Sequence, residues 1–246
     1  MSDLRRFFVP EITDELVIDG EEFRHAVSVL RIKENEQIIV CDNSGYEYIG
    51  TVNVINKKDM LVSITEKRAS DTEAKNSVTL IAGYLKGDKT ELVVQKAVEL
   101  GVKNIVVFDS EFSSAYMNAN KLERLNKVSK EAAKQCLRAT APEVVYFDSF
   151  DKALISAEGY ENKLFACEFA TESKCDVANL QGSVAIVIGS EGGFSREEEQ
   201  LANGKGFASV TLGKRILRAE TAAVALTSVV MFSLGELGER ECKNSK

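Results

Sequence analysis

Five apolar runs of strand length organise the sequence after residue 77, and they constrain the fold more than any other feature. The runs are VTLIAGYLK, NIVVFDS, NKLFACEFA, SVAIVIGS and FASVTLG, which begin at residues 78, 104, 162, 183 and 207. Helical patterns separate most of them. Apolar strands that alternate with helices are typical of a parallel sheet covered by helices. The sequence therefore predicts an α/β domain with a parallel sheet.

The first helix of this part is predicted over Lys89–Leu100 and ends at Gly101, a glycine in the position that commonly follows a helix. One side of this helix carries Leu92, Val93, Lys96-Ala97 and Leu100.

The N-terminal part follows a different pattern. Between Gln37 and Lys67, short β-rich runs alternate with turn signals at Asn43-Ser44-Gly45 and Lys57-Lys58-Asp59. This predicts antiparallel strands joined by hairpins, in a small β-barrel or curled sheet. The polar stretch Arg68–Ser77 lacks apolar periodicity and is the predicted linker. We expect two domains, residues 1–72 and 73–246.

Cysteine and histidine usage excludes several kinds of site. The five cysteines are odd in number and no two have C-x-x-C spacing, so neither a zinc site nor a redox pair is predicted. His25 is the only histidine, which excludes Ser-His-Asp triads and most histidine-built metal sites. We expect no bound metal.

The sequence predicts neither a signal peptide nor a membrane-spanning segment. The N-terminus has no apolar h-region, and the longest apolar stretch, Ala219–Leu234, contains polar residues and is too short to span a bilayer. We therefore expect a soluble, cytoplasmic protein that has no membrane partner.

The segment AIVIGSEGGFSREEEQL, residues 185–201, is the first candidate ligand site. A predicted strand ends at Gly189, and Ser195 with Glu198 forms an S-x-x-E capping box that opens a helix. Glycines let the backbone approach a ligand, and the helix N-terminus supplies free N–H groups. The segment matches neither G-x-G-x-x-G nor Walker A. Taken alone, it is equally typical of a ligand site and of a plain strand–turn–helix joint.

The segment TLGKRILRAETAAVAL, residues 211–226, is the second candidate. A strand again ends at a glycine, Gly213, and a long apolar helix follows. The polar residues between them are Lys214, Arg215, Arg218, Glu220 and Thr221. Such a group is costly at the start of an apolar helix unless it caps, pairs or contacts a ligand. The alternative to a ligand is that Glu220 pairs with an arginine and Thr221 caps the helix.

Together, the two segments resemble the paired C-terminal motifs of the SPOUT methyltransferases, and specifically those of the RsmE family of ribosomal RNA uridine N3-methyltransferases. Other blocks resemble the same family in the same order. They are Arg5-Arg6-Phe7-Phe8-Val9, His25 with Val29-Leu30-Arg31, Lys96–Val102, and Glu131-Ala132 with Gln135, Arg138 and Pro142.

Three positions depart from the family pattern. Ser190 stands where proline is usual, which should loosen that loop slightly. Cys136 replaces a common serine. Phe112 replaces the arginine that is usual in the segment Ser110–Ser113, which removes one positive charge and weakens the expectation of RNA affinity there.

The resemblance implies an α/β fold: a C-terminal SPOUT-type parallel sheet with a trefoil knot, preceded by a small PUA-like β-barrel domain that binds RNA. It implies S-adenosyl-L-methionine as cofactor, held by loops near Phe165–Glu168, Ile188–Gly193 and Leu212–Thr221. It also implies a homodimer with cofactor sites near the subunit interface. The residues implied in cofactor binding are Phe165, Ala166, Cys167, Ile188, Gly189, Glu191, Gly192, Gly193, Leu212, Gly213, Ile216, Leu217 and Thr221.

The implied reaction is methylation of N3 of a uridine in 16S ribosomal RNA, within the assembled small ribosomal subunit. Uracil N3 carries a proton, so it is a poor nucleophile until a base removes that proton. Arg218 is predicted to stabilise the developing negative charge, and Glu191 or Glu220 to act as base or orienting group. The alternatives are another RNA base, a ribose 2′-OH, or an RNA-binding protein without cofactor.

Basic residues outside the glycine loops are predicted to contact RNA. They are Arg5, Arg6, Arg24, His25, Arg31, Lys86, Lys127, Lys130, Lys134, Arg138, Lys214 and Arg215. Within Lys121–Arg138, four of them fall along one helix face at helical spacing. A packing or capping role for His25 and a solvated pair at Arg5-Arg6 are the alternatives.

Net charge limits how RNA is bound. The chain has 31 basic and 38 acidic side chains, a net charge of −7. Residues 1–72 hold nine basic and fourteen acidic side chains, a net charge of −5, so the predicted RNA-binding domain is the more acidic part. Bulk attraction to phosphate is therefore excluded. We expect weak binding to naked RNA and selectivity for a structured target.

Overall fold

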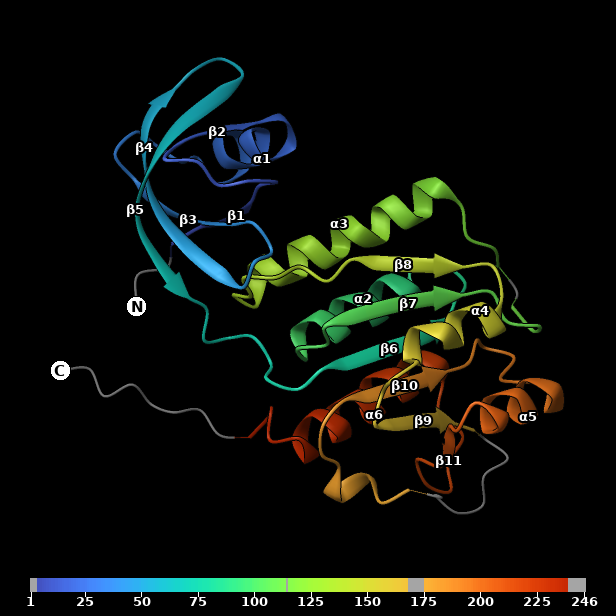
Figure 1. Ribbon diagram of the computed structural model, residues 1–246. Helices are drawn as coiled ribbons and strands as arrows, with labels where there is room; N and C mark the ends of the chain where they lie inside the picture. The colour runs from blue at the N-terminus through green and yellow to red at the C-terminus, as the bar shows by residue number, and fades with distance from the viewer. Residues whose placement is uncertain (1–3, 114, 168–174, 239–246) are drawn as a thin grey trace. The chain divides into compact units, whose positions relative to one another are not determined.

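The computed structural model describes residues 4–113, 115–167 and 175–238 (Figure 1). The chain divides into two compact units. The first comprises Met1–Glu73 and Ala133–Ala141, and the second comprises Ala74–Ala132 and Pro142–Lys246. The segment 133–141 thus belongs with the N-terminal β-rich part, although the sequence pattern assigned it to the C-terminal domain.

The first unit is built on one five-stranded sheet with the order β1-β3-β4-β5-β2. The strands are β1 (Arg6–Phe8), β2 (Glu15–Asp19), β3 (Gln37–Cys41), β4 (Tyr46–Ile55) and β5 (Asp59–Ala69). The predicted hairpins are confirmed, since β3–β4 and β4–β5 pair antiparallel. β1 is an edge strand and pairs parallel with β3. Register shifts at Ile49/Gly50 and Val52/Val54 are β-bulges, which bend and twist a sheet.

The concave side of this sheet is closed by α1 (Gly20–Arg24) and a π-helical turn, His25–Val29. Phe23 and Ala26 are buried there against Ile38, Val40 and other residues of the sheet. The apolar side of this short helical segment packs into the core of the unit.

The predicted linker begins two residues too early. β5 extends to Ala69, and Arg68 donates from Nη2 to the Glu47 carboxylate at 2.6 Å. The polar residues that suggested a linker at this point are the end of β5, where Arg68 lies opposite Glu47 of β4 and Ala69 opposite Tyr46.

The second unit is built on a six-stranded sheet in which every pairing is parallel, as the sequence predicts. The order is β11-β9-β10-β6-β7-β8. The strands are β6 (Val78–Gly83), β7 (Asn104–Phe108), β8 (Val144–Phe147), β9 (Asn162–Ala166), β10 (Val184–Ile188) and β11 (Ala208–Val210). β8 was missed because it is a four-residue edge strand and only its first residue, Val144, is buried.

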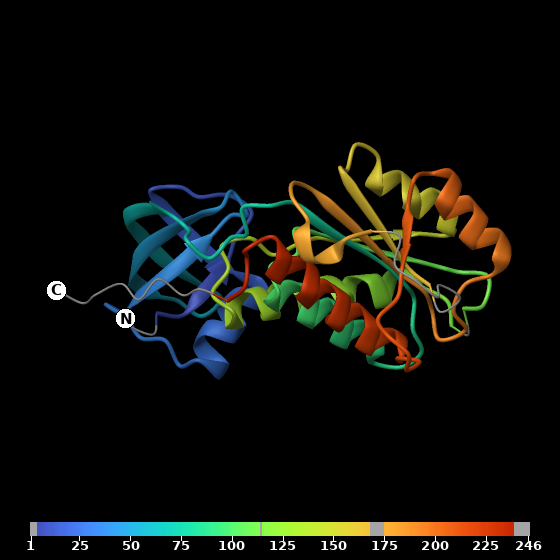
Figure 2. The ribbon, with the colours of Figure 1, turned by 90° about the horizontal axis from the view of Figure 1, so that it is seen from below.

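Helices cover both faces of this sheet. They are α2 (Lys89–Glu99), α3 (Ala119–Gln135), α4 (Phe150–Leu154), α5 (Arg196–Gly204) and α6 (Ala219–Ser233). Figure 2 shows α2 and α6 on one face and α4 and α5 on the other. On the latter face Phe150, Phe165 and Phe194 pack together, with ring centroids 4.3 Å apart for Phe165 and Phe194.

The predicted end of the first helix is confirmed, because α2 stops at Glu99 and Gly101 has a φ of +90°. On the side of α2 described from the sequence, Val93 and Ala97 are buried. Leu92 is 42 % exposed, and Val94 and Val98 are also buried. No helix of the described residues is long and apolar enough to cross a membrane.

Candidate functional site

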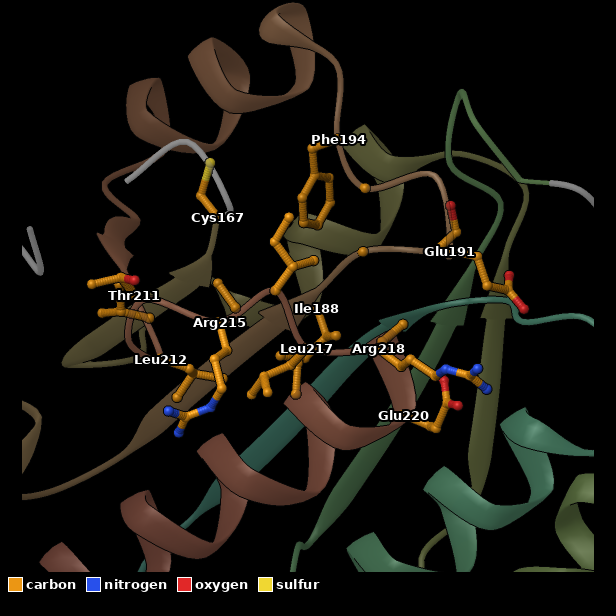
Figure 3. Close-up of a pocket in the computed structure, with 18 of the residues that line it drawn as sticks. Cys167, Ile188, Glu191, Phe194, Thr211, Leu212, Arg215, Leu217, Arg218 and Glu220 are labelled. Atoms are coloured by element: carbon orange, nitrogen blue, oxygen red, sulfur yellow. The ribbon is translucent and has the colours of Figure 1, made fainter. Parts of the chain in front are cut away.

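A cavity of about 810 Å³ lies at the carboxyl ends of β9 and β10. Its walls come from three segments that are distant in sequence: the end of β9, the loop after β10, and the loop between β11 and α6 (Figure 3). In an α/β sheet, ligands commonly bind outside the carboxyl ends of the strands. The strand order β11-β9-β10 brings these three ends together.

Hydrogen bonds hold the three segments in place. The Cys167 N–H, just after β9, donates to the carbonyl of Val210 at the end of β11, at 3.2 Å. In the loop after β10, the Gly193 N–H donates to the Ser190 carbonyl at 3.0 Å, and Gly193 has a φ of +70°. Only glycine adopts such a conformation without strain, so the loop is built for close backbone approach.

Gly83, at the end of β6, lies directly against the loop after β10. A Cβ atom on Gly83 would stand 2.6 Å from the Ser190 nitrogen and 3.0 Å from the Gly189 carbonyl carbon. Both neighbours are backbone atoms, so a side chain at this position would require the backbone of the loop to shift. Gly83 therefore fixes where the loop lies, a role that the strand-end glycine in VTLIAGYLK alone did not indicate.

Ser190, at the position where proline is usual in the family that the chain resembles, is buried. Its hydroxyl accepts a hydrogen bond from the Ser110 hydroxyl at 2.8 Å. The expected loosening of the loop is therefore opposed by a bond that proline cannot make.

The predicted capping box is confirmed. The Ser195 hydroxyl accepts from the Glu198 N–H at 3.1 Å, and the Glu198 carboxylate accepts from the Ser195 N–H at 3.0 Å. The other carboxylate oxygen of Glu198 accepts from the Glu111 N–H at 3.1 Å. The start of α5 is thus tied to the loop after β7.

Glu191 is held by two donors. Its carboxylate accepts from the Lys89 ammonium at 2.9 Å and from the Lys86 N–H at 3.0 Å. Partial burial raises the pKa of Glu191, but these hydrogen bonds outweigh it and hold the pKa below its ordinary value. A carboxylate held in this way is a weaker base.

The second loop ends in Arg218, whose backbone is extended and whose carbonyl accepts from the Ala222 N–H at 2.8 Å. Arg218 is therefore the N-cap of α6, and the alternative of a Thr221 cap is wrong. Glu220 lies in the first turn, and among the described residues its buried Oε2 has no hydrogen-bond partner. In Figure 3, Glu191, Arg218 and Glu220 lie at one end of the cavity, with Thr211, Leu212 and Arg215 at the other.

Most residues predicted to bind the cofactor line this cavity. They are Ala166, Cys167, Ile188, Gly189, Glu191, Gly193, Leu212, Gly213, Ile216 and Leu217, together with Arg218 and Glu220. Lys214 and Arg215, predicted to contact RNA, also line it.

Three predicted residues do not line the cavity. Phe165 is fully buried and packs against Phe194 in the aromatic cluster. Gly192 packs against Phe112, and Thr221 is an exposed residue of α6. Glu168 lies outside the described residues.

Sequence reasoning also missed lining residues. They are Lys89, Ser190, Phe194, Val210, Thr211, Ala219 and Ala222. Most are neighbours of predicted residues and could have been found by extending each motif. Lys89 could not, because only the pairing of β6 with β10 brings the start of α2 to this loop.

The residues predicted to contact RNA divide by exposure. Those with exposed side chains are Arg5, Arg24, Arg31, Lys86, Lys127, Lys130, Lys214 and Arg215. Arg6 is buried and pairs with Glu47 at 2.7 Å, so the alternative of a solvated Arg5-Arg6 pair is wrong for Arg6. His25 is half-buried, and its Nδ1 is buried with no hydrogen-bond partner among the described residues.

The predicted stripe of four basic residues on one helix face is wrong at its C-terminal end. Arg138 lies beyond α3 and is buried, and its guanidinium donates to Glu73 at 2.9 Å. Lys134 is largely buried and donates to Glu22 at 3.0 Å. Both contacts lie within the first unit, so these cations hold that unit together. Helical spacing gives no information about acidic partners that are distant in sequence.

The cavity can accommodate a nucleoside-sized group. Ile188, Leu212 and Leu217 supply apolar walls for a flat base, and backbone groups of the glycine loops supply donors and acceptors. The unpartnered Glu220 Oε2 offers an acceptor to a ligand. No group of three or more metal-ligating side chains occurs among residues 4–113, 115–167 and 175–238.

Comparisons with known proteins agree with this geometry. Residues 72–231 match the RNA methyltransferase domain family, and residues 18–65 match the RNA methyltransferase PUA domain family. Ribosomal RNA small subunit methyltransferase E of Mesomycoplasma hyopneumoniae is 35 % identical, over 90 % of this chain and 96 % of its own. The Bacillus subtilis protein of the same name is 29 % identical, over 93 % of this chain and 96 % of its own.

Solved structures resemble the chain over nearly its whole length. Ribosomal RNA small subunit methyltransferase E from Neisseria gonorrhoeae, bound to S-adenosyl methionine, has a TM-score of 0.84 and 31 % identity, over 94 % of this chain and 98 % of its own. A putative methyltransferase from Legionella pneumophila, in complex with bound cofactor SAM, has a TM-score of 0.85 and 28 % identity, over the same shares. The chain belongs to the ribosomal RNA small subunit methyltransferase E family.

Proposed function

We propose that this protein uses S-adenosyl-L-methionine to methylate N3 of a uridine in 16S ribosomal RNA of the small ribosomal subunit. The observation that carries the proposal is the cavity at the ends of β9 and β10, which is built from the same loops as the family motifs. Two relatives of this length and fold hold S-adenosyl methionine.

The residues of this chain fit the cofactor. Ile188, Leu212 and Leu217 would enclose the adenine and ribose, and Gly189 and Gly213 keep side chains out of the way. When bound, S-adenosyl-L-methionine supplies an electrophilic methyl group on a sulfonium. A proposed trefoil knot of the cofactor loops would hold these walls in a fixed arrangement.

The proton on uracil N3 must leave before N3 can attack. Two carboxylates line the cavity, and their surroundings differ. Glu191 already accepts from Lys89 and the Lys86 N–H, so it positions the loop. Glu220 has a buried oxygen with no protein donor among the described residues. Glu220 is therefore the stronger candidate to accept the N3 proton or to orient a water that does.

Arg218 provides the positive charge. Its side chain is exposed at the mouth of the cavity, at the N-cap of α6. As N3 loses its proton, negative charge spreads onto the two uracil oxygens that flank it. A guanidinium whose backbone is held at the start of α6 would stabilise that charge and hold the base in line with the methyl group.

The proposed partners follow from the same family. The substrate is 16S ribosomal RNA within the assembled small subunit, since a chain of net charge −7 gains little from bulk attraction to phosphate. The β-rich first unit would contact RNA through its exposed cations. A homodimer is supported by Val229 and Phe232, which are 45 % and 68 % exposed on the apolar helix α6. The proposed location is the cytoplasm.

Calorimetric titration with S-adenosyl-L-methionine tests the cofactor. Micromolar binding is expected, and no heat at high micromolar cofactor would contradict the proposal. Mass mapping of 16S ribosomal RNA from a strain that lacks the protein tests the target. We expect one N3-methyluridine to disappear and to return on complementation. Its persistence would show that the substrate is a different nucleotide.

A further inference from the structure

Phe112 lies directly against the loop after β10, on the segment Ser110–Ser113 that follows β7. A Cβ atom on Gly192 would stand 2.5 Å from the Phe112 Cβ and 3.0 Å from its carbonyl oxygen. The backbone of Phe112 therefore touches the residue between Glu191 and Gly193, which both line the cavity.

The neighbours of Phe112 fix its backbone on this loop. Ser110 donates from its hydroxyl to Ser190 at 2.8 Å, and the Glu111 N–H donates to Glu198 at 3.1 Å. Ser113 closes the turn, because its N–H donates to the Ser110 carbonyl at 3.0 Å and its hydroxyl accepts from the Ser110 N–H at 2.9 Å. Ser110 is thus anchored to the loop after β10, and Glu111 to the first turn of α5.

Phe112 is nevertheless 47 % exposed. The contact with Gly192 involves mainly the Cβ and the backbone, which any residue except glycine would supply. Packing of the loop therefore does not explain an aromatic ring here. An isolated exposed ring is common on protein surfaces, but this one is anchored beside the cavity in which the methyl group would be transferred.

Basic residues line the cavity or contact its wall. Lys86 has an exposed side chain and donates its N–H to Glu191, next to Gly192. Arg218 lines the cavity and is exposed. A planar π-face with exposed cations nearby is an arrangement that binds unpaired bases, since the ring stacks on the base and the cations meet the phosphates.

We propose that Phe112 is a substrate-positioning residue that stacks on an unpaired base of the RNA and holds it against the cofactor loop. The proposal rests on the proposed function, because it assigns the ring to that RNA.

Two variants separate stacking from packing. Phe112→Trp keeps a π-face, and Phe112→Leu keeps the Cβ contact with Gly192 and an apolar side chain but has no π-face. We would measure cofactor affinity by calorimetry, and methyl transfer to small subunits from a strain that lacks the protein. Phe112→Leu should raise the KM for subunits about tenfold with unchanged cofactor affinity, while Phe112→Trp stays within about threefold of the original protein.

The outcomes distinguish the two proposals. If the unchanged protein transfers no methyl group to the subunits, the proposed function fails and this role falls with it. If the unchanged protein is active and Phe112→Leu has the same KM, the ring does not stack and only the present inference is wrong. Equal losses in both variants, or a parallel loss of cofactor affinity, would show that Phe112 only supports the loop.

Discussion

The Glu191 carboxylate accepts a hydrogen bond from the Lys89 ammonium at 2.9 Å, which ties the loop after β10 to the first turn of α2. The Lys86 N–H donates to the same oxygen at 3.0 Å. Glu191 was predicted, with Glu220 as the alternative, to act as base or orienting group. Its two contacts anchor the loop after β10.

Lys89→Met should lower stability in a pH-dependent way. Because Lys89 and the Lys86 N–H hold the pKa of Glu191 below its ordinary value of 4.5, their stabilisation is present above the ordinary pKa and lost as pH falls through the lowered pKa. The pair is partly exposed, so the difference in free energy of unfolding should be about 0.5–1 kcal/mol at pH 7 and should be smaller at a pH below 4.5. Urea unfolding at pH 7 and at pH 3 measures it.

Lys152→Met is the control, because Lys152 pairs with Asp148 where both side chains are more than half exposed. Its effect should be smaller at pH 7. A Lys89→Met effect that is the same at pH 3 and pH 7 would show that the ion pair with Glu191 adds no stability.

Glu220→Gln and Glu191→Gln should affect different steps. Glu220→Gln removes the proposed proton acceptor, so turnover should fall about 100-fold or more while cofactor affinity changes little. Glu191→Gln weakens the contact with Lys89, so cofactor affinity should fall more than turnover. Steady-state kinetics and calorimetry together measure both. Full turnover in Glu220→Gln would show that solvent or another group takes the proton.

Arg218→Ala should depress turnover far more than cofactor affinity. Removing one stabilising donor from a developing charge costs about 100- to 1,000-fold in rate. Arg196→Ala is a suitable control, because Arg196 is an exposed arginine at the start of α5 that pairs with Glu199. It should leave turnover unchanged. Equal losses of turnover and affinity in Arg218→Ala would indicate that Arg218 only shapes the cavity.

Gly83→Ala should weaken cofactor binding, although Gly83 does not itself line the cavity. The new Cβ would meet the Ser190 nitrogen at 2.6 Å, so the loop must shift, at a cost of about 1–3 kcal/mol in stability. Gly204→Ala is the matched control, since nothing lies within 4 Å of a Cβ at that helix position. It should stabilise the protein by about 0.5 kcal/mol. Thermal unfolding with and without cofactor compares the two variants.

Arg6→Met should destabilise the first unit. Arg6 is buried and pairs with Glu47, which also accepts from Arg68. Loss of Arg6 leaves Glu47 buried with one partner, at a cost of about 3 kcal/mol in the free energy of unfolding. Arg5→Met, at an exposed neighbour, should change stability by less than about 0.5 kcal/mol. A stable Arg6→Met protein with weakened subunit binding would instead support RNA contact.

Local sequence patterns were sufficient wherever neighbouring residues decide the conformation. The β4–β5 hairpin, the end of α2 at Gly101 and the capping box of Ser195 and Glu198 depend on turn residues and on bonds that span a few positions. The two glycine motifs indicated most of the cavity because each lies directly after a strand.

Local patterns failed where a distant partner decides. Arg138 and Lys134 were assigned to an RNA-facing stripe. In the structure, Arg138 is buried and pairs with Glu73, and Lys134 is largely buried and pairs with Glu22, within the first unit. Nothing in the spacing of α3 could reveal carboxylates more than sixty positions away. The aromatic packing of Phe165 was missed for a similar reason, since its partner Phe194 follows β10 and is distant in the sequence.

The sequence by itself determined the parallel α/β sheet, the two glycine loops and the family, because apolar periodicity and motif order are properties of the chain. Only the tertiary structure showed that the surroundings of Glu191 and Glu220 differ: Lys89 and the Lys86 N–H donate to Glu191, whereas Oε2 of Glu220 has no hydrogen-bond partner among the described residues. It likewise brought Phe112 onto Gly192. Such contacts depend on which strand ends the sheet brings together, and that order is decided by packing of the whole unit.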